Sequence, residues 1–136
     1  KYVNPEIIEA KFSESEFIEN IVVFGEGQKF AAALIVPNFH DLRAWCHSKD
    51  IAYTTNEEMI KHPEVLKKFK KIVDEYNGFF GDTEKVKRFI LIGYEWSVAT
   101  GELTPTLKLK RNMLLNKYQE TDAIIITLNY FRKIAL

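Results

Sequence analysis

The sequence has a single cysteine, no excess of charge of either sign and no long apolar run. Without a second cysteine, Cys46 cannot form an internal disulfide, which excludes a disulfide-stapled scaffold and fits a reducing cytoplasm. Lysine plus arginine and aspartate plus glutamate number 19 each, so no overall field attracts nucleic acid or an anionic membrane. No apolar run approaches the roughly 20 residues of a spanning helix, and the run at 123–128 is interrupted by Thr127. We expect a cytoplasmic protein with no transmembrane segment and no nucleic-acid partner, for which peripheral membrane association stays open.

Length and hydrophobic content suit one folded unit. The 136 residues, 46% of them hydrophobic, are enough for one core but too few for two well-packed domains. There is no internal repeat, low-complexity tract or flexible linker. The chain begins on Lys1 rather than methionine, which we interpret as a start inside a longer protein or after processing.

Three β-rich runs predict a central sheet, at 21–24, 30–36 and 89–92. The first two are separated by a loop with Gly25 and Gly27, which predicts an antiparallel pair. The second run is apolar almost throughout, as expected of a strand covered on both faces, and it ends at Pro37. The third run is followed by Gly93 and by alternating apolar residues over 94–98, and we expect it to pair with the other strands.

Helices are predicted around these strands, at 5–12, 39–48 and 57–60, from Pro63 with Gly78 near its end, and at 110–118. Asn38 is the expected N-cap of the second helix, and Thr55 or Asn56 can cap the third. The apolar stripe expected on the fourth consists of Leu66, Phe69, Val73, Tyr76 and Phe80. This order of elements predicts an α+β (mixed α/β) fold with about three central, largely antiparallel strands, an additional hairpin or edge strand, and flanking helices.

Most generic signatures of catalysis are incomplete. The segment 25–27, Gly-Glu-Gly, lacks the later glycine of a dinucleotide fingerprint and the Gly-Lys-Ser/Thr of a phosphate loop, so it predicts a hairpin turn. His40, Cys46 and His47 lie on or near one predicted helix but lack a fourth ligand and a familiar spacing, so we expect no metal site. No Gly-x-Ser-x-Gly elbow surrounds a serine, and nothing near Cys46 indicates an activated thiol.

One cationic loop remains, at 101–111, with the sequence Gly-Glu-Leu-Thr-Pro-Thr-Leu-Lys-Leu-Lys-Arg. Its Lys108, Lys110 and Arg111 are close together along the chain. A lysine ammonium is a compact, mobile point charge, suited to a carboxylate or to a phosphate that carries charge only briefly. Taken by itself, the loop is also compatible with an ordinary exposed basic turn.

This loop resembles the C-terminal signature of the acyl-adenylate-forming superfamily, in a variant similar to that of long-chain fatty acyl-CoA synthetases. Residues 1–9 resemble the stretch just after the family's hinge, where Lys-Tyr-Val or Tyr-Ile precedes Pro-x-x-Ile-Glu. Residues 21–37 and 84–92 resemble the family's strands in order and spacing. The resemblance covers residues 1–118 and implies the C-terminal lid domain of an AMP-forming acyl-CoA ligase, followed by a tail, 119–136, of unassigned role.

The resemblance implies a catalytic role for one lysine of the loop. The common motif, Pro-Lys-Thr-x-Ser-Gly-Lys, ends in a lysine that contacts the carboxylate and the α-phosphate during adenylation. Alignment on the closing Arg111 places this lysine at Lys108, with Lys110 as the alternative, although no Ser-Gly precedes it here. The residues implied to support the loop are Glu102, Thr104, Pro105, Thr106 and Arg111.

The family's catalytic cycle implies a second set of contacts, because the lid rotates after adenylation and presents the residues after the hinge to the pantetheine channel. Lys1, Tyr2 and Val3 would then lie near CoA, and an edge strand packed on the sheet is the alternative interpretation of Tyr2 and Val3. ATP, Mg²⁺ and CoA would be bound mainly by a large N-terminal domain absent from this sequence. No cofactor is expected in this chain itself.

The function implied is that of the mobile C-terminal domain of a long-chain fatty acid–CoA ligase, which converts a fatty acid and ATP to an acyl-adenylate and transfers the acyl group to CoA. Its main partner would be the N-terminal domain of the same polypeptide, and the isolated chain is expected to be inactive. Two alternatives stay open. One is a free-standing α+β interaction or ligand-sensing domain, and the other is an adenylate-forming ligase that uses an acyl-carrier protein.

Overall fold

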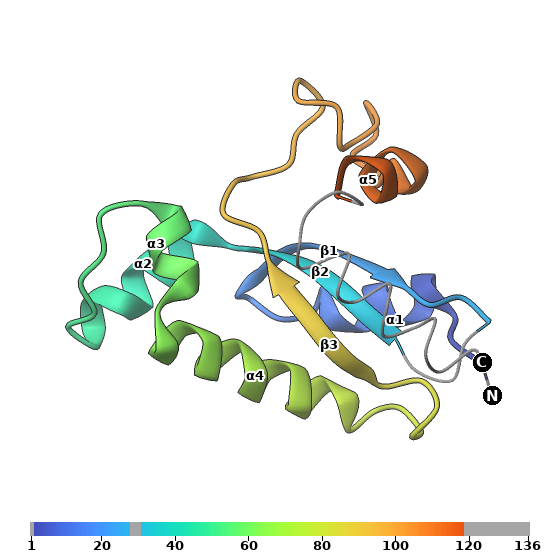
Figure 1. Cartoon of the computed structure of the whole chain (residues 1–136), viewed down its shortest axis with the longest axis horizontal. Coiled ribbons are helices and arrows are strands. Elements are labelled where there is room, and N and C mark those ends of the chain that lie inside the picture. The colour runs from blue at the N-terminus through green and yellow to red at the C-terminus, as the bar shows by residue number, and fades with distance from the viewer. Residues whose placement is uncertain (1, 28–30, 119–136) are drawn as a thin grey trace. The chain divides into compact units, whose positions relative to one another are not determined.

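The computed structural model describes residues 2–27 and 31–118, which fall into two compact units (Figure 1). The first unit is Lys1–Glu95 and the second is Trp96–Leu136. Length and hydrophobic content had predicted a single folded unit. The second unit nevertheless has buried apolar side chains of its own, among them Trp96, Leu103, Leu114 and Tyr118.

The sheet lies in the first unit and has three strands in the order β1-β2-β3. β1 (Ile18–Phe24) is antiparallel to β2 (Ala31–Pro37), as the glycines between them predicted. β3 (Val86–Leu91) pairs with the other edge of β2. All residues of β2 are buried, which fits a central strand covered on both faces.

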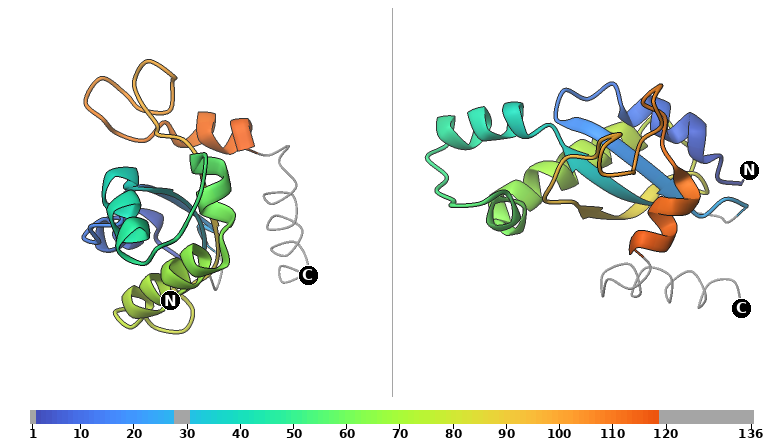
Figure 2. Two further views of the ribbon diagram at one scale, coloured as in Figure 1. Left: turned by 90° about the vertical axis from the view of Figure 1, so that its left-hand side faces the viewer. Right: turned by 90° about the horizontal axis from the view of Figure 1, so that it is seen from above.

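Four helices accompany the sheet, namely α1 (Pro5–Phe12), α2 (Phe39–Ser48), α3 (Asn56–Lys61) and α4 (Pro63–Asn77). The predicted cap of α2 is confirmed, since the Asn38 side chain accepts a hydrogen bond from the Asp41 amide at 3.2 Å. Thr55 rather than Asn56 caps α3, because its hydroxyl accepts from the Glu58 amide at 3.1 Å. α1 lies beside β1 and also contacts α4 (Figure 2).

The prediction of a largely antiparallel sheet was wrong for one of the two strand pairings. β3 runs parallel to β2, with Leu34 opposite Ile90. The reason is the connection between them, which contains α2, α3 and α4. A crossover of this length carries the chain back across the sheet, so the next strand enters in the same direction as β2.

The buried face of α4 differs from the predicted stripe at several positions, since Tyr76 is only half-buried and Phe80 lies beyond the end of the helix. Phe69 and Val73 are buried as predicted, but Leu66 is 42% exposed and Val65 is fully buried. Successive residues are about 100° apart around a helix, so Val65 shares a face with Phe69, four residues later, while Leu66 is turned away from it.

Two buried polar side chains that were not predicted connect helices to strands. Asn77, at the end of α4, donates to the Val86 carbonyl oxygen at 2.8 Å and accepts from the Val86 amide at 2.9 Å. Glu9 of α1 accepts from the Val23 amide of β1 at 2.7 Å. These bonds satisfy backbone groups that would otherwise be buried without partners, and they fix the places of α1 and β3.

The second unit contains a short hairpin and α5 (Arg111–Tyr118). The additional hairpin predicted from the sequence is closed by an antiparallel bridge between Leu103 and Leu109. The alternating residues at 94–98 form no strand, and the Trp96 indole donates to the Tyr118 hydroxyl at 2.9 Å. None of the helices within 2–27 and 31–118 is both long and apolar enough to cross a membrane.

Candidate functional site

Residues 102–110 form the hairpin that carries both candidate lysines. At its base, the Lys110 amide donates to the Glu102 carbonyl oxygen at 2.9 Å. Nearer the tip, the Thr104 amide donates to the Lys108 carbonyl oxygen at 2.8 Å, and the Leu107 amide donates to the Thr104 carbonyl oxygen at 2.7 Å. The backbone on both sides of Lys108 is therefore held by hydrogen bonds.

Leu107 ends the turn in a left-handed backbone conformation, with a φ of 63°. A β-carbon disfavours this conformation, whereas glycine adopts it freely. The Leu107 side chain is 68% exposed, so little burial offsets the strain. The path of the hairpin thus requires a left-handed residue immediately before Lys108.

Lys108 and Lys110 are both exposed on the outgoing arm of the hairpin. They are two residues apart in an extended segment, so their side chains leave the same side of the arm, opposite to half-buried Leu109. Within the described ranges, neither ammonium has a hydrogen-bond or ion-pair partner. Both positive charges are available to an anion that approaches from outside this unit.

The other residues predicted to support the loop lie on the same hairpin and at the start of α5. Pro105 and Thr106 are exposed in the turn, and Arg111 is the first residue of α5. The Thr104 hydroxyl accepts from the Lys108 amide at 3.1 Å. Thr104 is thus the predicted supporting residue whose side chain directly contacts the backbone of Lys108.

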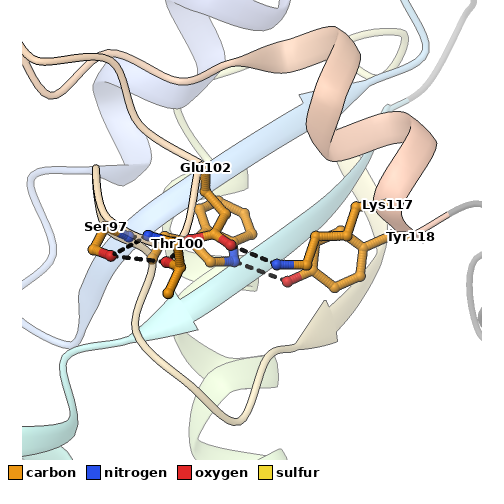
Figure 3. A network of polar contacts seen from close by, with 6 residues as sticks. Ser97, Thr100, Glu102, Lys117 and Tyr118 are labelled. Carbon is orange, nitrogen blue, oxygen red and sulfur yellow. Dashed lines mark hydrogen bonds and ion pairs between the residues drawn. The ribbon is translucent and has the colours of Figure 1, made fainter.

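Glu102 has a fully buried carboxylate, which the sequence did not predict. One oxygen accepts from the Ser97 amide at 3.1 Å and from the Thr100 hydroxyl (Figure 3). The other accepts from the Lys117 ammonium of α5 at 2.5 Å. Burial acts to raise the pKa of Glu102, but hydrogen bonds from these three groups and the charge of Lys117 outweigh it and hold the pKa below its ordinary value. Glu102 is therefore ionised at neutral pH.

The residues predicted to lie near CoA belong to the first unit. Lys1 lies outside the described residues. Tyr2 is 64% exposed, whereas Val3 is buried and its carbonyl oxygen accepts from the Gly27 amide at 3.5 Å. Residues 2–4 form no strand, so the alternative interpretation as an edge strand was wrong.

The residues considered as metal ligands do not form a site. Cys46 is buried in α2, while His40 and His47 are exposed. No group of three or more His, Cys, Asp or Glu residues in the described part of the chain could hold a metal ion. Burial raises the pKa of the Cys46 thiol despite the positive charge of Lys68, so the sulfur is not an activated nucleophile.

Comparison with known protein families identifies the domain to which these residues belong. The AMP-binding enzyme C-terminal domain matches residues 1–124. The chain belongs to this family. Among curated relatives of the domain, long-chain-fatty-acid–CoA ligase 6 of Mus musculus is 32% identical over 127 residues, and long-chain-fatty-acid–CoA ligase 1 of Homo sapiens is 30% identical over 125 residues. The alignments each cover 88% of this chain but only 18% and 17% of the relatives, so the chain spans about a fifth of their length.

Solved structures share the fold of this chain. The adenylation domain of a carboxylate reductase from Mycobacterium chelonae superposes with a TM-score of 0.61 and 21% identity, over 92% of this chain and 17% of that one. At this identity the similarity concerns the fold alone. The predicted α+β class and the family resemblance are both confirmed.

Proposed function

We propose that this domain is the mobile lid of an AMP-forming long-chain fatty acid–CoA ligase. In that reaction a fatty acid and ATP give an acyl-adenylate and pyrophosphate, and CoA then takes the acyl group and releases AMP. The family match, the names of the relatives and the small share of their length that the chain spans all support this proposal. Residues 1–118 would form the lid, and the tail at 119–136, outside the described residues, has no assigned role.

The partner of the lid would be the N-terminal domain of the same polypeptide, which would hold most contacts to the fatty acid, ATP and CoA. Mg²⁺ is bound through carboxylate and phosphate oxygens, and the described residues offer no acidic cluster for it. The lid would therefore contribute a positive charge and leave the metal to the nucleotide and the N-terminal domain. A cytoplasmic location with peripheral membrane contact would suit a fatty-acid substrate.

Lys108 is the residue that we assign to adenylation. Attack of the fatty carboxylate on ATP builds negative charge around the α-phosphorus, and an ammonium delivered by lid closure stabilises that charge more in the transition state than before it. The observation that carries the assignment is the left-handed backbone of Leu107, immediately before Lys108. The common motif has its glycine in this place, directly before the lysine.

Lys110 is the alternative, and its surroundings favour a supporting role. Its amide closes the base of the hairpin on Glu102, and it directly precedes α5. The residue before it, Leu109, forms the extended bridge to Leu103 rather than a left-handed turn. We therefore expect the charge of Lys110 to support the loop without replacing that of Lys108.

Rotation of the lid after adenylation would bring the segment after the hinge to the pantetheine of CoA. The exposed side chain of Tyr2 suits a direct contact there. Buried Val3 suits a role in holding the segment, because its carbonyl is already bonded to Gly27. Lys1 would complete this face by resemblance to the family.

The test separates the two half-reactions in the full-length protein that carries this domain. Lys108→Ala is expected to slow acyl-adenylate formation, followed as pyrophosphate release, by on the order of a hundredfold. Transfer from preformed acyl-adenylate to CoA should change far less, because the rotated lid no longer places Lys108 at the reacting carbonyl. Lys67→Ala, which removes an exposed lysine of α4, is the matched control.

Each outcome of this test has a defined meaning. Lys110→Ala is expected to give a smaller adenylation defect than Lys108→Ala, and the reverse order would transfer the catalytic role to Lys110. Equal loss in both half-reactions would contradict a role restricted to adenylation. Transfer to an acyl-carrier protein in place of CoA would overturn the choice of acceptor. Full-length protein without any adenylation activity would refute the ligase and favour a free-standing interaction domain.

A further inference from the structure

The hairpin that carries Lys108 is anchored at its base by a buried charge. Glu102 opens the hairpin, and its carboxylate binds Lys117 at the far end of α5. We propose that Glu102 is a positioning residue that sets the place of Lys108 for adenylation through its ion pair with Lys117. The proposal rests on the function proposed above and adds to it a residue that does not itself touch the substrate.

The chemistry of the Glu102 site demands a defined geometry. A carboxylate removed from water is strongly disfavoured unless hydrogen bonds and a positive charge surround it. Glu102 has no exposed surface, and both of its oxygens are engaged, one by Ser97 and Thr100 and the other by Lys117. Ser97 and Thr100 belong to one hydrogen-bonded turn, whereas Lys117 lies on α5, so the carboxylate can keep all three donors only if the turn and the helix stay in place.

The backbone of Glu102 connects this anchor to the lysine. Its carbonyl oxygen accepts from the Lys110 amide, and the next rung of the hairpin joins Thr104 to Lys108. A shift of Glu102 would therefore move the two hydrogen-bonded rungs that fix the backbone of Lys108. The hairpin is short and has one antiparallel bridge, so it contains little structure that could absorb such a shift.

A second contact keeps the end of α5 against the same segment. The Tyr118 hydroxyl accepts from the Trp96 indole at 2.9 Å, next to the ion pair of Lys117 (Figure 3). The centroids of the Trp96 and Tyr118 rings are 6.1 Å apart, and both residues are buried. Two consecutive residues of α5 thus hold the segment 96–102, with Tyr118 bound to Trp96 at its start and Lys117 bound to Glu102 at its end. Loss of the ion pair alone should leave the Trp96–Tyr118 contact and the fold in place while loosening the hairpin.

The experiment uses Glu102→Gln and Lys117→Met in the full-length protein. The amide keeps the shape of Glu102 but presents an NH₂ group or a neutral oxygen to the Lys117 ammonium, and Lys117→Met removes the positive charge from a partly exposed position. Each variant is expected to lower the kcat of adenylation by about tenfold or more, as small displacements of catalytic groups do. The KM values for fatty acid and ATP, and transfer from preformed acyl-adenylate, should stay close to wild type. Asp74→Asn, which breaks the exposed pair with Lys70, is the matched carboxylate-to-amide control.

A second comparison tests whether Glu102 acts through Lys108. Glu102→Gln should cause no further loss of adenylation in a Lys108→Ala background, because no ammonium is left to position. An equal fold-loss in both backgrounds would overturn the proposal, as would wild-type kinetics for both Glu102→Gln and Lys117→Met. Parallel loss in the two half-reactions would also overturn it and assign the ion pair to folding. Failure of the proposed function is distinct, since it would leave the wild-type protein itself without adenylation activity.

Discussion

Replacement of Leu107 by glycine should leave stability and adenylation nearly unchanged. The left-handed φ of 63° disfavours a residue with a β-carbon by about 1–2 kcal/mol. Glycine removes this strain but adds flexibility to the unfolded chain, worth about 0.5–1 kcal/mol in the opposite direction. The side chain is 68% exposed, so its removal sacrifices little packing. The free energy of unfolding of Leu107→Gly should therefore lie within about 1 kcal/mol of wild type.

Replacement of Leu107 by valine should have the opposite effect. Branching at the β-carbon makes the left-handed conformation worse, so the turn should lose about 1 kcal/mol or more. If φ became negative, the hydrogen bond from the Leu107 amide to Thr104 would break and the backbone of Lys108 would be displaced. Leu107→Val should therefore slow adenylation several-fold, while transfer of the acyl group to CoA should be spared.

The assay compares thermal stability and both half-reaction rates for the full-length protein with each substitution. Leu66→Gly is the control, because Leu66 is an exposed leucine in α4, where glycine is expected to destabilise the helix by about 1 kcal/mol. Slow adenylation in Leu107→Gly together with normal adenylation in Leu107→Val would refute the reasoning. That pattern would show that the loop needs the leucine side chain and not the left-handed backbone.

Three further predictions follow from the same structure. The isolated 136-residue chain should turn over no palmitate, ATP and CoA, because most substrate contacts are expected on another domain, and measurable thioester formation would contradict this. The lowered pKa of Glu102 means that its ionised form stabilises the fold above the ordinary carboxyl pKa. This stabilisation should be lost as pH falls through the lowered pKa, so the melting temperature of wild type should approach that of Glu102→Gln in acid, and a constant difference would argue against an ionised Glu102. Asn77→Ala should destabilise the protein by about 2–3 kcal/mol in denaturant unfolding, because two buried bonds to Val86 are lost, whereas exposed Asn112→Ala should have little effect.

Local chemistry made most elements of the fold predictable. Pro5, Asn38 and Pro63 mark helix starts through fixed backbone angles or capping oxygens, and each helix begins where these residues predict. The direction of β3 was not predictable in the same way, because an apolar strand has the same composition whether it runs parallel or antiparallel. Direction follows instead from the length of the crossover, which the run of predicted helices between the second and third strands already implied.

In the candidate site, too, the residues that are close in sequence were predictable and the contacts between distant residues were not. Lys108 and the turn residues are neighbours in sequence, so their spacing was sufficient to bring them together. Glu102 and Lys117 are separated by 15 residues, and no local pattern connects them. The alternation over 94–98 was a misleading signal, because Trp96 is buried by its contact with Tyr118 and not by a place in a sheet. The Glu102–Lys117 and Trp96–Tyr118 contacts both depend on the path by which α5 returns to residues 96–102, and hydrophobic periodicity gives no information about that path.

Glu102 and Lys108 lie on the same hairpin but in opposite surroundings, since Glu102 is buried and Lys108 is exposed. This difference suggests a reason for the Glu102–Lys117 pair. Buried ion pairs add little to stability compared with apolar residues of similar size, because desolvation offsets the attraction. Stability alone is therefore a weak reason to bury a glutamate six positions before an exposed lysine. An exposed carboxylate on the same hairpin would be a ready partner for Lys108 and would compete with an incoming phosphate. With its carboxylate satisfied by Lys117, Ser97 and Thr100, Glu102 can fix the hairpin without neutralising Lys108, whose ammonium stays unpaired within the described residues.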